Sequence, residues 1–83
     1  MVDLVQLDYK KNKKMKEILE RLEIEKAELV DKLTKLATFI ESEKFEKVEV
    51  NQSRLMTAQI FAMSTYAEIL EKRIEFMKYE LEK

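Results

Sequence analysis

Three side chains with clear chemical potential, Gln59, Tyr66 and Arg73, are spaced seven residues apart. On a helix this spacing stacks them along one line. An amide, a phenol ring and a guanidinium group in that arrangement can contact the edge of a base, stack on its face and pair with a phosphate. A polar row on an otherwise apolar stripe can instead fix the register of a helical assembly, with Glu68 or Glu75 of another copy pairing with Arg73. The two interpretations are compatible, and the sequence leaves both open.

A second candidate group lies near the N-terminus, where Tyr9 is followed closely by Lys10, Lys13 and Lys14. Residues 1–16 carry five lysines and two aspartates, a local charge of +3. One ring beside several ammonium groups suits a phosphate-bearing ligand. The alternative is a solvated start of a helix whose lysines serve solubility.

Two further cations are candidates for ligand contact. Arg54 and Arg73 could together hold an anionic ligand at an interface between copies. Lys26 is the one polar member of an apolar seam, so it either contacts a ligand or packs its methylenes and extends its ammonium group to the rim.

The composition excludes several classes of chemistry. The chain has 83 residues and a net charge of −1, and it contains no Cys, His, Gly or Pro. Without these residues there is no thiol nucleophile, no usual zinc ligand set and no glycine-rich phosphate loop. The sequence therefore predicts a protein that is not an enzyme, that holds no metal or cofactor, and that lacks the broad basic face of a duplex DNA reader.

The sequence shows no sign of a membrane segment or a signal peptide. Its longest uncharged run, residues 55–67, is thirteen residues long, whereas a spanning helix needs about 20. We expect a soluble intracellular protein with no membrane partner.

The elements that must position these side chains are two long helices in a single domain, residues 1–83. Apolar residues spaced alternately four and three apart define one face of each helix. We expect a first helix over residues 9–40, a connection over 41–51 anchored by Phe45, and a second helix over 52–81, with Asn51 and Ser53 as candidate N-caps. Residues 1–8 are an N-terminal arm or a start of the first helix. The seam of the first helix is Met15, Leu19, Leu22, Lys26, Leu29, Leu33, Leu36 and Ile40, and that of the second is Met56, Ile60, Met63, Ala67, Leu70, Ile74, Met77 and Leu81.

The second helix carries an additional stripe beside its seam. A two-helix hairpin covers one face of each helix, and soluble monomers seldom expose a large apolar patch. We therefore predict an all-α, antiparallel two-helix hairpin that assembles into a homo-oligomeric helical bundle through its second helix. The additional stripe is Leu55, Gln59, Ala62, Tyr66, Ile69, Arg73 and Phe76.

The chain resembles a family of small helical-hairpin proteins encoded by crAss-like and other tailed phages. The resemblance covers roughly residues 22–76, and its most specific part is the spacing of Gln, Met, Tyr and Arg-Ile in the second helix. The residues that carry it are residues 39–42, Phe45, Leu55, Met56, Gln59, Met63, Tyr66, Ile69, Leu70, Arg73 and Ile74.

A weaker resemblance links Arg54, Gln59, Met63 and Arg73 to the hairpin domain of phage anti-CBASS and anti-Thoeris sponge proteins. Those are small oligomers that bind cyclic nucleotide immune signals without cleaving them. The resemblance implies a phage anti-defence protein of the host cytoplasm that sequesters a cyclic di- or oligonucleotide, or a cyclic ADP-ribose-type ligand, between copies of itself. Arg54, Arg73 and the lysines at 10, 13 and 14 would pair with phosphates, Tyr9 and Tyr66 would stack on bases, and Gln59 would contact a base edge.

A structural or protein-interaction hairpin is the alternative. Such a protein would be a coiled-coil scaffold or an inhibitor of a host protein, and it would hold a partner helix in an apolar groove.

Overall fold

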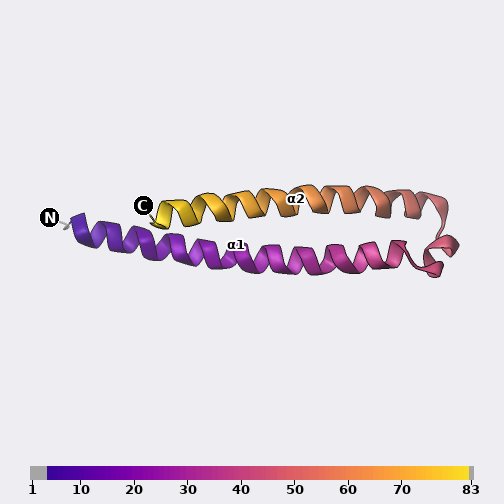
Figure 1. Ribbon diagram of the computed structural model, residues 1–83, viewed down its shortest axis with the longest axis horizontal. Helices are drawn as coiled ribbons and strands as arrows, with labels where there is room; N and C mark the ends of the chain where they lie inside the picture. The colour runs from indigo at the N-terminus through magenta and orange to yellow at the C-terminus, as the bar shows by residue number, and fades with distance from the viewer. Residues whose placement is uncertain (1–3, 83) are drawn as a thin grey trace.

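The computed structural model describes the backbone of residues 4–82 and the side chains of residues 12–82. Helix α1 spans Leu4–Ile40, the short 3₁₀ helix η1 spans Glu43–Lys47, and α2 spans Val50–Glu82. The two long helices run antiparallel and form a rod of 67 × 19 × 14 Å (Figure 1). Over the described residues the protein is all-helical, which confirms the predicted fold class at the level of a single chain.

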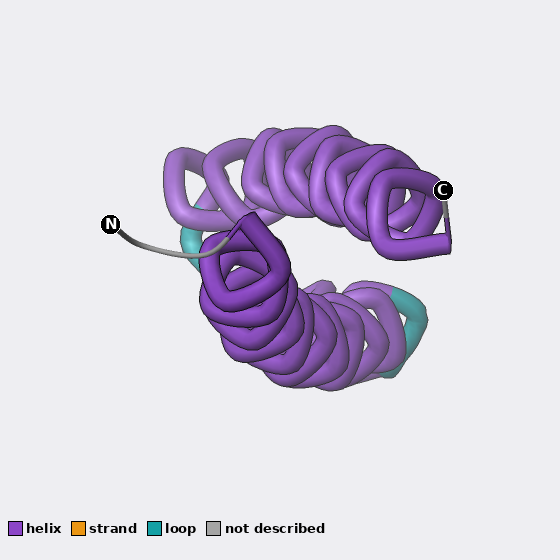
Figure 2. Tube along the Cα trace, turned by 90° about the vertical axis from the view of Figure 1, so that its left-hand side faces the viewer, coloured by secondary structure: helices purple, strands orange, loops and turns teal. Residues whose placement is uncertain are grey.

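The seam of α1 faces α2, as its spacing predicts. Leu22 is buried, and the other seam members from Met15 to Ile40 are half-buried. On α2, Leu70 and Ile74 are buried, and with Leu22 they form the core, against which Leu19 and Leu29 pack. Viewed along the rod, the helices sweep in opposite directions across each other, as expected of a pair that crosses at an angle (Figure 2).

Helix α1 starts earlier than its expected first residue, 9. Residues 4–8 are helical, whereas the sequence left open whether residues 1–8 form an arm or part of the helix; residues 1–3 lie outside the described part. Once a helix has nucleated, each added residue gains one hydrogen bond, and residues 4–8 contain no Gly or Pro to stop this extension. The end of α1, at Ile40, agrees with the prediction.

Helix α2 also starts before its expected first residue, 52. Glu49 precedes the helix, and its Oε2 accepts a hydrogen bond from the backbone N–H of Gln52 at 3.1 Å. Glu49 thus takes the N-cap role that the sequence suggested for Asn51 or Ser53, both of which lie inside the first turn of α2. The Ser53 hydroxyl instead donates to the carbonyl oxygen of Val50 at 2.9 Å. A glutamate is an unusual cap, and sequence preferences therefore pointed to its neighbours.

The connection between the helices is compact. Phe45 of η1 packs edge-on against Phe39 of α1, with ring centroids 6.4 Å apart and planes at 85°. The Ser42 hydroxyl donates to the carbonyl oxygen of Phe39 at 2.6 Å. These contacts confirm Phe45 as the apolar anchor of the connection. Within residues 4–82, neither long helix contains a stretch apolar enough to cross a membrane.

Candidate functional site

The surface of α2 that faces away from α1 is unusually apolar. Leu55 is 63% exposed, Ile69 is 52% exposed and Phe76 is 70% exposed, although all three are large hydrophobic residues. This confirms that the hairpin covers one face of α2 and leaves the additional stripe in water.

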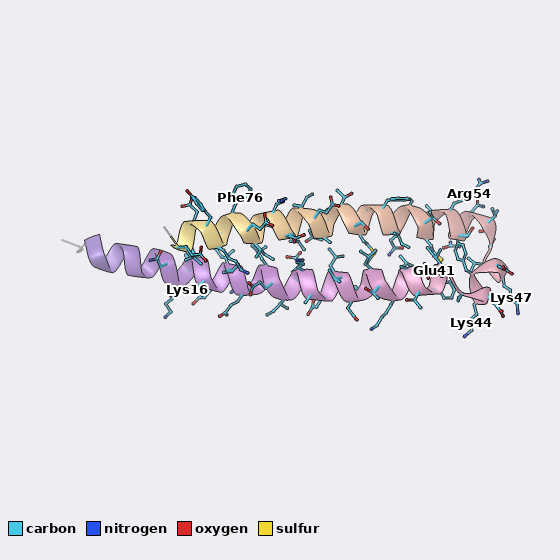
Figure 3. All side chains as sticks on the ribbon, viewed as in Figure 1. Lys16, Glu41, Lys44, Lys47, Arg54 and Phe76 are labelled. Carbon is cyan, nitrogen blue, oxygen red and sulfur yellow. The ribbon has the colours of Figure 1, made fainter. Side chains whose placement is uncertain are left out.

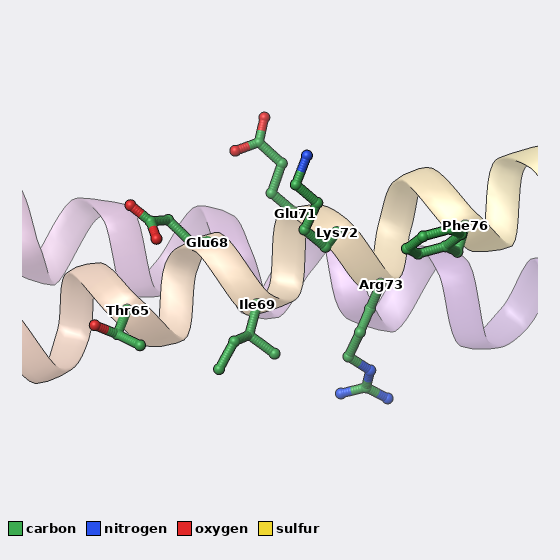
Figure 4. Close-up of a pocket in the computed structure, with 7 residues that line it drawn as sticks. All are labelled: Thr65, Glu68, Ile69, Glu71, Lys72, Arg73 and Phe76. Atoms are coloured by element: carbon green, nitrogen blue, oxygen red, sulfur yellow. The ribbon is translucent and has the colours of Figure 1, made fainter.

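A shallow groove of about 480 Å³ lies on this surface, toward the open end of the hairpin. Arg73 and Ile69 project from α2 to the same side, and the ring of Phe76 lies one turn farther along (Figure 4). A guanidinium group beside an aliphatic and an aromatic side chain can hold an anion and a flat apolar group together. All lining residues come from α2: Thr65, Glu68, Ile69, Glu71, Lys72, Arg73 and Phe76.

The polar row predicted from the sequence lies on the exposed side of α2. Gln59, Tyr66 and Arg73 are all exposed, Tyr66 at 42%. Tyr66 is also tied to α1, because its hydroxyl donates a hydrogen bond to the Glu25 carboxylate. The hydroxyl group of Tyr66 therefore takes part in the contact between the two helices, while part of its ring remains accessible for stacking.

The two candidate arginines of α2 lie far apart in one chain. Nineteen residues separate Arg54 from Arg73, which corresponds to about 28 Å along a helix. Arg54 lies at the connection end, and the groove next to Phe76 lies near the open end (Figure 3). Among the described residues, neither guanidinium has a hydrogen-bond or ion-pair partner. A single copy thus offers two separate unpaired cations and does not bring them together.

Lys26 takes part in the contact between the helices. Its side chain is half-buried, and its ammonium nitrogen lies 3.9 Å from the Glu71 Oε1. A second bridge joins Lys78 to Glu23 at 3.5 Å. This geometry fits the interpretation in which Lys26 packs its methylenes and extends its charge to the rim.

The N-terminal cluster is only partly described. Lys13 and Lys14 are exposed on α1, while the side chains of Tyr9 and Lys10 lie outside the described residues. In Figure 1 this end of α1 extends beyond the last turn of α2. The cluster therefore lies at the same end of the rod as Arg73, opposite Arg54.

Sequence reasoning missed Glu25 and Glu71 as partners, and it assigned Ile69 and Phe76 to packing alone. Aligning the two seams antiparallel and looking for opposite charges beside them would have suggested the Lys26–Glu71 and Glu23–Lys78 pairs. Over residues that the structure describes, no cluster of three or more acidic side chains is arranged to hold a metal ion.

The fold and the site define a small all-α hairpin whose candidate chemistry lies on an open helix surface. The Sequestin family model matches residues 16–76, which is 61 of the 83 residues. The chain therefore belongs to the Sequestin family. It is also similar to the "uncharacterized 7.5 kDa protein in denB-rIIB intergenic region" of Enterobacteria phage T4, with 40% identity over 58 residues that cover 70% of this chain and 91% of the relative. No solved structure matches.

These findings confirm the resemblance to a family of small phage hairpin proteins. The matched range contains Lys26, Arg54, Gln59, Tyr66 and Arg73, whereas the cluster at residues 9–14 lies before it. The α2 surface, unlike the N-terminal cluster, thus belongs to the part of the chain that the family shares.

Proposed function

We propose that this protein is a phage anti-defence protein that binds a nucleotide second messenger in the host cytoplasm and sequesters it without chemical change. The observation that carries the proposal is the unpaired Arg73 beside the exposed Ile69 and Phe76 on α2. Membership of a family named for sequestration supports a binding role.

The residues of the groove fit the chemistry of a nucleotide. Arg73 would pair with a phosphate through two parallel hydrogen bonds. The exposed rings of Tyr66 and Phe76 would stack on bases, an interaction worth about 1–3 kcal/mol per base. Gln59 would contact a base edge through its amide.

Self-association would complete the site. Pockets for small ligands bury most of the ligand surface, and one copy of α2 supplies a single open wall. A second copy packed on α2 would supply the opposite wall and cover Leu55 and Phe76. Arg54 of one copy could then approach a ligand held by another copy. We therefore propose a homo-oligomer that assembles through α2.

The N-terminal cations would add phosphate contacts from the end of α1. Tyr9, Lys10, Lys13 and Lys14 are close together in sequence on a helix that extends past α2. Lys26 would contribute mainly by holding the two helices in register, through Glu71.

Binding without turnover predicts a particular solution behaviour. A protein that only sequesters lowers the free concentration of its ligand in proportion to the number of sites. The ligand should be recovered intact when the protein is denatured.

Calorimetry against cyclic dinucleotides, cyclic trinucleotides and cyclic ADP-ribose isomers tests the proposal. We expect saturable binding of at least one of them, weakened by Arg73→Leu and not by the matched control Arg21→Leu on the outer side of α1. Chromatography of the ligand after protein denaturation should return the starting compound. Absence of binding across the panel, or conversion of the ligand, would contradict the proposal.

The exposed apolar surface of α2 also favours the second candidate, a scaffold or inhibitor that captures a helix of another protein. A thermal melt separates the two. Ligand at 100 times its dissociation constant stabilises the folded state by about 2.7 kcal/mol, so a nucleotide binder melts at a higher temperature with its ligand and a scaffold does not.

A further inference from the structure

The outermost surface of α2 carries a seam of its own, which shares four residues with the additional stripe and whose other members lie farther from α1. We call it the outer seam. Its residues are spaced alternately three and four apart, the spacing of a helix–helix contact, and every one of them is exposed in the hairpin. Small residues at its centre, Ala58, Ala62 and Thr65, allow another helix to approach closely. The outer seam consists of Leu55, Ala58, Ala62, Thr65, Ile69, Lys72, Phe76 and Tyr79.

The charges that bound this surface are arranged symmetrically. Residues 55–67 carry no charge, and their midpoint is Phe61, which is 70% exposed. The first charges on either side are Arg54 and Glu68, of opposite sign and each seven residues from Phe61. Seven residues are two helical turns, so all three lie along the same border of the outer seam.

This arrangement distinguishes the two directions in which identical helices can pack. In a parallel two-fold pair, the border that carries Arg54 and Glu68 lies on opposite sides of the interface in the two copies, so Arg54 cannot meet Glu68 of the other copy. In an antiparallel pair centred on Phe61, each Arg54 faces the other copy's Glu68. Neither side chain has a partner among the residues described in the hairpin, so both are available for this contact.

We propose that the protein pairs with a second copy of itself through the part of the outer seam from Leu55 to Lys72, antiparallel, with the two-fold axis at Phe61. The inference rests on the self-association of the proposed function and specifies its direction and register. An isologous contact of this kind is the commonest symmetry among homo-oligomers.

The polar groups of the outer seam tolerate burial in such a contact. The Thr65 hydroxyl donates to the carbonyl oxygen of Phe61 at 3.1 Å within its own helix. It therefore enters the interface already hydrogen-bonded, which removes the main cost of burying it. Lys72 lies near the end of the seam, where its long side chain can reach water.

The pairing also positions the candidate ligand residues. Gln59, Tyr66 and Arg73 border the outer seam on the side opposite Phe61. In an antiparallel two-fold pair, equivalent borders of the two copies meet. The polar rows of both copies therefore lie along one side of the interface, and the second copy contributes residues to each ligand site.

Charge reversal tests the register. The variants Arg54→Glu, Glu68→Arg and the double variant are compared by sedimentation equilibrium, with far-UV circular dichroism to check folding. Each single reversal replaces two attractive contacts per pair with repulsive ones, and we expect the dissociation constant for pairing to rise about tenfold. The double variant should return to within about threefold of the unaltered protein.

Matched controls are available on α1. Arg21→Glu and Glu28→Arg make the same charge changes at exposed positions away from the outer seam. We expect neither to change the dissociation constant appreciably. Absence of recovery in the Arg54→Glu/Glu68→Arg double variant would overturn the proposed register.

Cross-linking tests the direction independently. The chain contains no cysteine, so single-cysteine variants report only self-contacts. Phe61→Cys, at the axis, should cross-link to itself with a short bismaleimide. Leu55→Cys should not, because its two copies would lie about 18 Å apart along the helix axis. Efficient self-cross-linking of Leu55→Cys would indicate a parallel pair and overturn the inference, and Ile24→Cys on α1 serves as the background control.

The outcomes separate this inference from the proposed function. If the unaltered chain is a folded monomer at micromolar concentration, the proposed self-association fails, and the antiparallel pair fails with it. If the chain associates but the two reversals do not compensate, the antiparallel register alone is overturned. Nucleotide binding is measured separately, by the calorimetry described above.

Discussion

The two long helices of this hairpin have similar lengths and very different surfaces. The outer side of α1 is rich in charge, and one of its ion pairs joins Lys35 to Asp31 at 2.9 Å. The outer side of α2 has no charge between Arg54 and Glu68 and exposes Phe61 and Phe76. A hairpin needs one apolar face on each helix. The second apolar surface of α2 exceeds this need, and we propose that it serves a contact outside the single chain.

The largest expected effect concerns the core that both helices share. Leu70 is fully buried, and its truncation in Leu70→Ala should lower the free energy of unfolding by about 2–5 kcal/mol, because it leaves a cavity that the thin core cannot close. Urea denaturation at fixed protein concentration measures this. Ile24→Ala, which truncates a 59% exposed residue of α1, should change stability far less. Equal losses in the two variants would mean that α2 is not packed as described.

Arg73→Leu examines the outer surface of α2 without changing the core. Loss of charge-assisted hydrogen bonds of about 1.5–3 kcal/mol should weaken nucleotide binding by about 10–100-fold. Calorimetry measures the affinity, and ultracentrifugation measures assembly. Intact assembly with lost binding supports a ligand role for Arg73. Altered assembly with unchanged binding would assign Arg73 to register alone.

Glu49→Ala concerns the start of α2. Loss of the hydrogen bond from the Gln52 N–H should cost about 0.5–1 kcal/mol in stability. Denaturant unfolding would show this loss, and Glu46→Ala in η1, at a glutamate outside the start of α2, is the matched control. A neutral result for Glu49→Ala would mean that the first turn of α2 does not depend on this cap.

The smallest effect is expected from Tyr66→Phe. The change removes the hydroxyl that donates to Glu25 and keeps the ring, so stability should fall by about 1 kcal/mol or less. Nucleotide affinity should remain within about threefold, because stacking depends on the ring. A large loss of affinity would show that the hydroxyl itself contacts the ligand, and that the tie to α1 is released on binding.

Most of the fold could be predicted from spacing. The alternation of four and three residues identified both seams, and Leu22, Leu70 and Ile74 are the buried members of those seams. The starts of the helices were harder to place. Residues 4–8 contain no Gly or Pro that would make α1 begin at residue 9, and the cap of α2 is a glutamate rather than the favoured Asn51 or Ser53.

The candidate site could be predicted only in outline. The spacing of Gln59, Tyr66 and Arg73 placed them on one exposed side of α2, as found. The contact between Tyr66 and Glu25 depends on the register between the helices, which neither seam determines alone. The proposal that Arg54 and Arg73 act on one ligand requires a second copy, because 19 residues separate the two arginines along α2.

The thin cross-section of the rod has a consequence for how a ligand would be held. The molecule is only two helices thick, at 19 × 14 Å in cross-section, and three hydrophobic residues of its described part are buried. A rod of this thickness has no room to enclose a small molecule within one subunit. Under the proposed function, a ligand would be captured and released as two copies associate and dissociate, so the lifetime of the bound ligand would be tied to that of the assembly.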